Sequence, residues 1–172
     1  MDVDRAIEWA EDQLLEGEAS HPRECTGEVT LEQFPLLRHL TPAQIERLRP
    51  YLKSALWPAG STIFNEGDPG SHLFLVSQGR ASVRLLSANR NIRLATFGPG
   101  SLFGELALLD SGPRSASVTA DEDVATWTLA EHDFRTLQAQ DPDIAVNILS
   151  ALGRELSGRL RQANMTIHQL ET

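Results

Sequence analysis

The sequence predicts a mainly β protein with flanking helices, a β-sandwich or jelly-roll barrel between two helical ends. Eight of the chain's 12 glycines lie between Gly60 and Gly112 and divide that region into short segments. Apolar stretches recur there about every 8–12 residues between Gly and Pro turns, which is typical of such all-β folds. Both ends of the chain instead carry apolar residues at the helical spacings of three and four.

The N-terminal segment is predicted to be an amphipathic helix followed by a linker. In residues 2–15 the apolar positions at helical spacing are Val3, Ala6, Ile7, Ala10 and Leu14. Such a stripe must be buried against another surface. Residues 16–29 contain Gly17, Pro22 and Gly27 among several charges, which favours a linker or irregular loop. We expect domain boundaries of 1–29 for this segment, 30–165 for the folded domain and 166–172 for a C-terminal tail.

Two short helices are expected before the β region. The first covers residues 31–39 and carries Leu31, Phe34 and Leu37. The second begins at Thr41, which suits an N-cap; Pro42 suits the first helical position and Gln44 completes a capping box. The apolar stripe of this second helix is predicted to consist of Ile45, Leu48 and Leu52.

The β region runs from Trp57 to Leu129. Strands are predicted at residues 62–64, 73–76, 81–86, 92–97, 116–119 and 124–129. The turns that separate them include Gly67-Asp68-Pro69-Gly70, Gln78-Gly79 and Gly98-Pro99-Gly100.

The C-terminal part is predicted to be helical. A short helix covers residues 131–139, with Phe134 and Leu137 as its apolar positions. Asp141 and Pro142 then provide the N-cap and the first residue of a long helix. The apolar side chains of that helix lie four apart, at Ile144, Ile148, Leu152, Leu156 and Leu160.

Composition and charge argue against several functional classes. The net charge is −9, and so acidic a chain lacks the basic face that general binding to nucleic acid or an anionic membrane requires. Cys25 is the only cysteine, so no disulfide framework and no cysteine-based zinc site are expected. The five histidines show no metal-ligand spacing, and no serine has a His/Asp arrangement near it. No apolar run approaches the length of a membrane span. We expect no catalytic residues, no metal and no nucleic-acid partner.

The stretch from Phe103 to Ser117 contains the candidate binding residues. Gly104 allows backbone N–H groups to approach an anion, and the residues after it read as a short helix whose N-terminal amides would face that anion. Arg114 can bind a phosphate through two parallel hydrogen bonds, and Ser115 adds a hydroxyl donor beside it. The Glu105 carboxylate lies in an apolar run and suits ribose hydroxyls. An acceptor and a fixed cation together suit the two ends of a nucleotide.

From about Leu31 to Leu160, the chain resembles the cyclic nucleotide-binding domain family. The resemblance rests on five blocks in order: residues 58–60 (PAG), 64–68 (FNEGD), 74–79 (FLVSQG), 103–109 (FGELALL) and 113–118 (PRSASV). The block around Arg114 looks most like those of prokaryotic cyclic-nucleotide-regulated channels and kinase regulatory subunits. The resemblance implies an eight-stranded β jelly-roll barrel with N-terminal helices, a short phosphate-binding-cassette helix and a C-terminal lid helix.

The same resemblance assigns roles to individual residues. Glu105 would bind the ribose 2′-hydroxyl, and Arg114 would pair with the cyclic phosphate. The other ligand-binding candidates are Gly104, Leu106, Ala107 and Ser115, with backbone amides of this segment completing the phosphate site. The candidates on the lid helix are Leu152, Arg154 and Arg159. For the two lid arginines the alternative is an ordinary solvated helix charge.

The implied function is a non-catalytic regulatory module that binds cAMP in preference to cGMP and signals by movement of the lid helix to an attached or partner domain. A hydroxyl directly after Arg114 leaves cGMP open as the ligand. The alternative is the same fold with an idle site, acting as a protein-interaction domain. A catabolite-activator-type transcription factor would need a helix-turn-helix beyond the long helix, and the printed sequence ends at Thr172. A cupin-type enzyme would need a His/Glu metal cluster on its strands.

A second resemblance concerns residues 6–15, AIEWAEDQLL. They are similar to the segment that links a STAS domain to a cyclic nucleotide-binding domain in some bacterial SulP-type anion transporters and glutaminase-type polypeptides. This resemblance implies a parent protein with an effector or membrane-transport domain. It also implies a cytoplasmic location, in the transporter case tethered to the inner face of the membrane. The alternative for this helix is docking on the barrel or formation of a homodimer.

Overall fold

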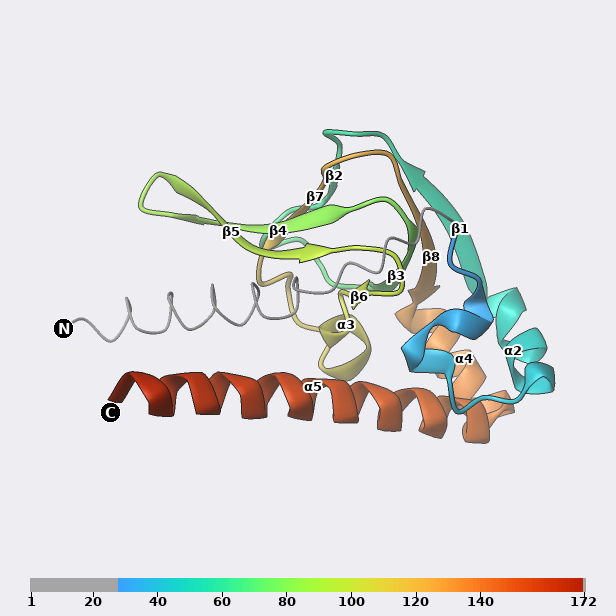
Figure 1. Cartoon of the computed structure of the whole chain (residues 1–172). Helices are drawn as coiled ribbons and strands as arrows, with labels where there is room; N and C mark the ends of the chain where they lie inside the picture. Colours follow the sequence, from blue (N-terminus) through green and yellow to red (C-terminus); the bar gives the residue numbers. More distant parts are fainter. Residues whose placement is uncertain (1–27, 172) are drawn as a thin grey trace.

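The computed structural model describes residues 28–171, so the predicted helix of residues 2–15 and most of the predicted linker lie outside it. Figure 1 shows two β-sheets that lie above one long C-terminal helix, with shorter helices at one end. In chain order the elements are η1 (Leu31–Gln33), η2 (Pro35–Leu37), α2 (Pro42–Leu48), η3 (Arg49–Tyr51), β1 (Leu52–Trp57), β2 (Thr62–Phe64), β3 (His72–Gln78), β4 (Ala81–Ser87), β5 (Arg90–Phe97), β6 (Leu102–Phe103), α3 (Leu106–Leu109), β7 (Ser117–Ala120), β8 (Val124–Ala130), α4 (Glu131–Gln140) and α5 (Pro142–Glu171).

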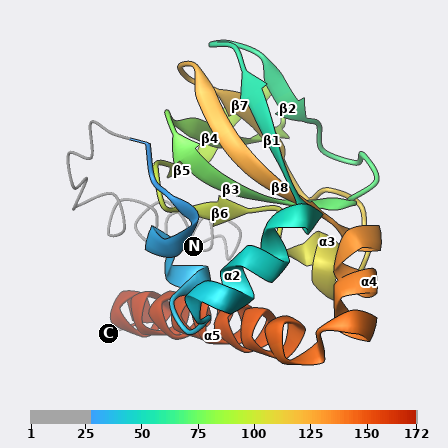
Figure 2. The same ribbon diagram turned by 90° about the vertical axis from the view of Figure 1, so that its right-hand side faces the viewer.

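The eight strands confirm the predicted fold class. They form two four-stranded sheets, in the orders β1-β8-β3-β6 and β2-β7-β4-β5. Every pairing between neighbouring strands is antiparallel. The sheets pack as a jelly-roll sandwich whose edges are not closed into a barrel. Helices cover the outer side of the first sheet (Figure 2).

Strand β3 is buried on both faces and separates two hydrophobic cores. Leu73 and Leu75 belong to a core shared with the helices, whereas Phe74 and Val76 belong to the core between the two sheets. This division follows from strand geometry, because successive side chains point to opposite faces. One strand therefore supports both the helical layer and the interior of the sandwich.

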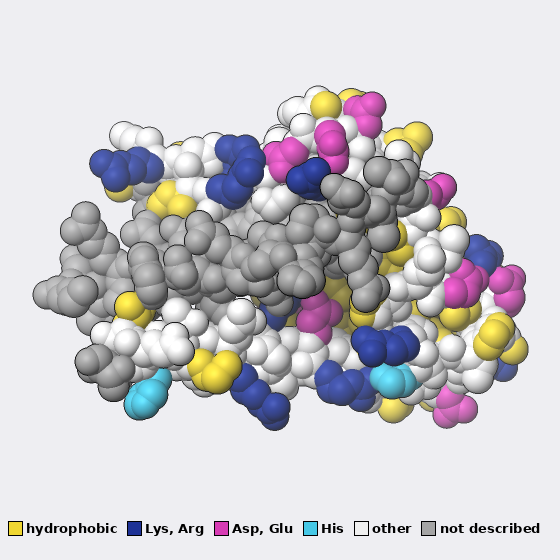
Figure 3. All heavy atoms as spheres, in the orientation of Figure 1, with side chains coloured by type: hydrophobic (Ala, Val, Ile, Leu, Met, Phe, Trp, Pro, Cys, Tyr) yellow, Lys and Arg dark blue, Asp and Glu magenta, His cyan; other side chains and the backbone are white. Residues whose placement is uncertain are grey.

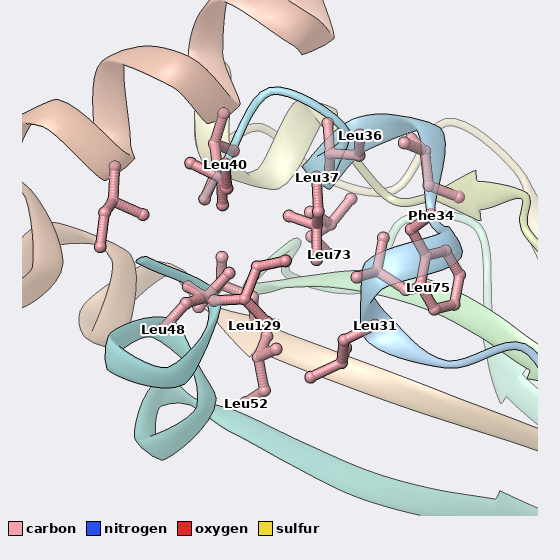
Figure 4. Packing of buried hydrophobic residues seen from close by; sticks show 14 of the residues in the cluster. Leu31, Phe34, Leu36, Leu37, Leu40, Leu48, Leu52, Leu73, Leu75 and Leu129 are labelled. Atoms are coloured by element: carbon pink, nitrogen blue, oxygen red, sulfur yellow. The ribbon is translucent and has the colours of Figure 1, made fainter. Parts of the chain in front are cut away.

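The helical core gathers leucines from both ends of the described chain. Figure 4 shows that those of η1, η2 and α2 meet others from β1, β3 and β8. The cluster also includes Phe134 and Leu137 of α4 and the first half of α5. The apolar positions predicted for the two C-terminal helices therefore lie in this core as far as Leu152.

The predicted single helix over residues 31–39 is wrong. The chain forms two 3₁₀ turns instead, and Pro35 begins the second. Proline disfavours helical backbone in the residue before it, and Phe34 is accordingly extended, with φ −69° and ψ 127°. The capping box at Thr41 is confirmed, since the Gln44 N–H donates to Thr41 Oγ1 at 3.2 Å and the Thr41 N–H donates to Gln44 Oε1 at 2.9 Å.

The assignment of Leu52 to the second helix is also wrong. Helix α2 ends at Leu48, the 3₁₀ turn that contains Pro50 follows, and Leu52 begins strand β1 opposite Leu129. Leu52 keeps the four-residue apolar spacing because it faces the same helical core from the sheet side. The structure thus adds strand β1 and the two-residue strand β6 to those predicted.

Helix α5 is 30 residues long, which corresponds to about 45 Å. Its first half is buried against the helical core, whereas Leu160, Met165 and Leu170 in its second half are exposed. The helix continues to Glu171 without a break where the tail was predicted to begin. No helix between residues 28 and 171 combines the length and apolar character needed to cross a membrane.

We expect Leu152→Ala to lower the free energy of unfolding by about 2–5 kcal/mol, because it leaves a cavity in a fully buried part of the helical core. Urea denaturation followed by circular dichroism measures this change. Leu160→Ala is the matched control on the same helix, where the side chain is 63% exposed, and should change stability by less than about 0.5 kcal/mol. Equal losses in the two variants would contradict the placement of the core.

Candidate functional site

The segment from Phe103 to Ser117 forms a strand end, a sharp turn, the short helix α3 and a loop that returns to β7. Gly104 makes the turn with a φ of +77°, a conformation that L side chains rarely adopt. A Cβ at this position would lie 2.8 Å from Arg114 Nη1 and 2.8 Å from the His72 carbonyl oxygen. Glycine is therefore required here by backbone conformation and by the close approach of Arg114.

The loop after α3 is fixed by short hydrogen bonds at both ends. The Asp110 carboxylate accepts from the Gly112 N–H at 2.8 Å, and Ser111 Oγ donates to Glu131 Oε1 of α4 at 2.6 Å. The Arg114 N–H donates to the Asp68 carbonyl at 2.8 Å. The loop thereby joins helix α4 to the turn between β2 and β3, with Arg114 on the inner side.

Arg114 is a buried cation that contacts two backbone carbonyls and an aromatic ring. It is 9% exposed, Nη2 donates to the His72 carbonyl at 2.8 Å, and Nη1 donates to the Gly104 carbonyl at 3.4 Å. Its guanidinium lies 4.1 Å from the centroid of the Phe64 ring, a cation–π contact. The buried Nε has no hydrogen-bond partner in the described part of the chain. An arginine in this condition is suited to receive an anion.

The charge of Arg114 is maintained despite this burial. Burial lowers the pKa of the guanidinium, whereas the nearby carboxylates of Glu105 and Asp68 act in the opposite direction. Arginine has so high an ordinary pKa that it stays protonated at neutral pH. Burial and the positive charge of Arg114 also lower the pKa of His72, so its imidazole adds no competing charge to the site.

A pocket of about 250 Å³ opens beside α3. All six predicted ligand-binding residues line it: Gly104, Glu105, Leu106, Ala107, Arg114 and Ser115. The remaining wall is largely apolar and comes from β2, β4, β5, β6 and β7, through Phe64, Val83, Ala95, Phe97, Phe103 and Val118. One end of the pocket is therefore cationic, and the side walls are hydrophobic.

The predicted lid residues do not all reach this pocket. Arg159 lines it, but Leu152 is fully buried in the helical core and Arg154 is exposed elsewhere on α5. The positions differ because Arg159 lies two turns beyond Leu152, or about 10 Å along the helix axis. At that point α5 has passed the helical core and runs beside α3 (Figure 1).

Arg159 forms an ion pair with another residue of the pocket lining, Glu105. Its Nη1 lies 3.5 Å from Glu105 Oε1, and its Nη2 donates to Glu155 Oε1 one turn earlier on α5 at 2.5 Å. The Glu105 side chain is 14% exposed and that of Arg159 is 30% exposed. The carboxylate predicted to bind ribose thus faces a cation from the long helix.

Two neighbours of Arg114 were not predicted as site residues. His72 contributes through its backbone carbonyl, which carries no signal in the sequence, and Phe64 contributes the face of its ring. Phe64 begins one of the family blocks, so its position was visible but its role was not. The amide of Ala107 donates to the Gly104 carbonyl at 3.2 Å in this structure.

A family model described as the cyclic nucleotide-binding domain matches residues 56–141. The chain belongs to the cyclic nucleotide-binding domain family. The resemblance inferred from the five sequence blocks is thereby confirmed. The matched region contains the whole Phe103–Ser117 segment, together with seven of the strands and part of β1.

Three comparisons place this cyclic nucleotide-binding domain among known proteins. The chain is 37% identical over 137 residues to the cyclic AMP receptor protein of Thermus thermophilus, covering 79% of this chain and 62% of that protein. It is 35% identical over 170 residues to glutaminase 2 of Bradyrhizobium diazoefficiens, covering 98% of this chain and 26% of the enzyme. The solved N-terminal domain of a transcriptional regulator from Streptomyces coelicolor A3(2) superposes with a TM-score of 0.68 at 35% identity, covering 74% and 92% of the two chains.

The chain therefore spans less than two thirds of the length of these two full-length relatives. Among residues 28–171, no group of three or more His, Cys, Asp and Glu side chains is placed to hold a metal ion. The predicted likeness of residues 6–15 to a STAS linker lies outside the described residues and stays a prediction.

Proposed function

We propose that this chain is a non-catalytic regulatory module that binds a cyclic nucleotide, with cAMP preferred over cGMP, in the pocket beside α3. The observation that carries this proposal is the state of Arg114. A buried guanidinium, whose Nε has no hydrogen-bond partner within residues 28–171, lines a pocket with largely apolar walls, in a chain of net charge −9. Such a cation favours a small anionic ligand over a large anionic surface, because it is accessible only from within the pocket.

The two charged residues Arg114 and Glu105 in the pocket wall suit the two polar groups of a cyclic nucleotide. Arg114 would pair with the cyclic phosphate beside the backbone of Gly104 and Ser115. Glu105 would accept a hydrogen bond from the ribose 2′-hydroxyl, as the family resemblance implies. The apolar walls at Val83 and Phe97 would then contact the rest of the nucleotide.

Transmission of the signal is proposed to use α4 and α5. The hydrogen bond between Ser111 and Glu131 connects the loop after α3 to the first residue of α4. Helix α4 packs in turn against α5 through the shared core that contains Leu137 and Leu152. A ligand can move this helical layer only through a difference in its affinity for the two arrangements.

The output is proposed to be an attached or partner domain in the cytoplasm. The relatives extend well beyond the matched region, which supports an attached effector domain; a membrane-transport domain and tethering to the membrane stay predictions.

A homodimer through α5 is supported by the alternating spacing of four and three between Leu156, Leu160, Ala163, Ile167 and Leu170. On the face shown in Figure 3, basic and acidic side chains of the described residues are mixed. A nucleic acid would need a mainly basic face, so this mixture fits a protein partner better.

Isothermal titration calorimetry of the purified chain with cAMP and with cGMP tests the binding function. We expect saturable binding of one nucleotide per chain, tighter for cAMP than for cGMP, and no comparable binding of adenosine, which lacks the phosphate that Arg114 would hold. Absence of binding by both cyclic nucleotides would favour the idle-site alternative. Tighter binding of cGMP would keep the site but reverse the proposed preference.

A further inference from the structure

Arg159 links the long helix to the carboxylate that is expected to recognise ribose. The Arg159–Glu105 pair joins two elements more than 50 positions apart in the sequence, at a distance of 3.5 Å. Among residues 28–171, Arg159 is the only side chain that forms an ion pair with Glu105. The contact therefore ties α5 to the pocket at one defined atom pair.

Glu155 holds the Arg159 side chain in place for this contact. The two residues are four positions apart on α5, so their side chains lie one above the other on the same face of the helix. Nη2 of Arg159 is bonded to Glu155, which leaves Nη1 directed toward Glu105. The guanidinium thus bridges a carboxylate of its own helix and a carboxylate of the pocket.

Glu105 needs this cation most when the ligand is present. Its side chain is only 14% exposed and lies two positions after the buried Phe103, where a charge without a partner is costly. Arg114 also acts on Glu105 through its charge, but a bound phosphate would neutralise Arg114 and add a negative charge to the same pocket. Arg159 is then the cation that compensates Glu105.

We propose that Arg159 is a positioning residue that acts through Glu105. It orients the carboxylate for the ribose 2′-hydroxyl, and it makes ribose recognition depend on α5 lying beside the pocket. This inference rests on the proposed function. It assigns Arg159, one of the three predicted lid residues, to the sugar end of the ligand.

The test compares two ligands that differ only at the hydroxyl in question. Calorimetry with cAMP and with 2′-deoxy-cAMP is carried out on the unmodified chain and on Arg159→Gln. We expect Arg159→Gln to weaken cAMP binding about tenfold, as for loss of support to a charged hydrogen-bond acceptor. Binding of 2′-deoxy-cAMP should change by less than about twofold, because that ligand does not use Glu105 at the 2′ position.

Two further variants separate this role from general effects. Arg161→Gln removes an exposed cation from the same helix outside the pocket and should leave both affinities unchanged. In a Glu105→Gln background, the additional change Arg159→Gln should have almost no further effect on cAMP binding, since residues that act together are non-additive. Urea denaturation of each variant shows whether it is folded.

Each other outcome overturns the proposal. Equal loss for both ligands would mean that Arg159 contacts the nucleotide itself, and unchanged or tighter cAMP binding would mean that it does not support Glu105. Additive losses in the double variant would separate Arg159 from Glu105. If the unmodified chain binds neither ligand, the proposed function fails, and that result is distinct from a failure of Arg159 alone.

Discussion

Replacement of Arg114 by alanine is expected to weaken cAMP binding by a factor of about 30 to several thousand. This corresponds to about 2–5 kcal/mol, the cost of removing one partner of a buried, hydrogen-bonded charge pair. The phosphate would enter a pocket that has lost its buried cation and still contains the like charge of Glu105. Calorimetric titration of the variant with cAMP, next to the unmodified chain, measures the loss.

Arg114 also supports the protein backbone, and the experiment has to separate this role from binding. The alanine variant removes the donors to the His72 and Gly104 carbonyls, so its unfolding in urea must be measured alongside. Arg114→Lys keeps the charge but loses the two-pronged geometry, and we expect its affinity to lie between those of the other two proteins. Arg38→Ala, at an exposed position outside the pocket, should bind cAMP normally. Normal binding by a folded Arg114→Ala variant would refute the site.

Gly104→Ala is expected to destabilise the fold and to impair binding together. The φ of +77° is strained for alanine, and the new Cβ would meet the His72 carbonyl oxygen and Arg114 Nη1 at 2.8 Å each. The His72 oxygen belongs to strand β3 and cannot move freely, so we expect a loss of about 1–3 kcal/mol in the free energy of unfolding. Because Arg114 must also be displaced, the affinity for cAMP should fall at least about tenfold.

Gly60→Ala provides the matched control for this substitution. Gly60 has a φ of +81°, close to that of Gly104, but a Cβ there would have no atom within 4 Å. It should therefore show only the cost of the backbone conformation, about 1 kcal/mol, with normal binding of cAMP. If the two alanine variants lost the same stability and both bound cAMP normally, close packing at Gly104 would play no part in the site.

The sequence predicted best where a residue's role follows from its own chemistry and local spacing. Glycine followed by Glu105, with Arg114 nine positions later, was sufficient to place one end of the pocket, and the turn residues located most strands. Elements that depend on distant partners were missed. Leu52 continues the spacing of α2 yet pairs with Leu129, a strand 77 positions away, and only the folded sheet decides between the two.

The same limit explains what was missed in the site. The carbonyl of His72 accepts a hydrogen bond from Arg114. Every residue has a backbone carbonyl, so the residue type at this position could not predict the contact. Arg159 was one of several helix arginines, and its distinction comes from where α5 passes the cassette, two turns beyond the helical core. Leu152 was predicted as a lid residue, but its side chain is buried in the helical core instead.

The position of strand β3 between two cores constrains how this pocket could change over evolution. The side chains from Leu73 to Val76 pack alternately against the helices and inside the sandwich. The carbonyl of the first residue of β3, His72, accepts a hydrogen bond from Arg114. A substitution in β3 would therefore disturb packing and anion binding at once. The pocket residues of β4 and β5, such as Val83 and Phe97, pack only against the core between the sheets. New ligand preferences within this fold are accordingly expected to arise on those two strands while β3 stays constant.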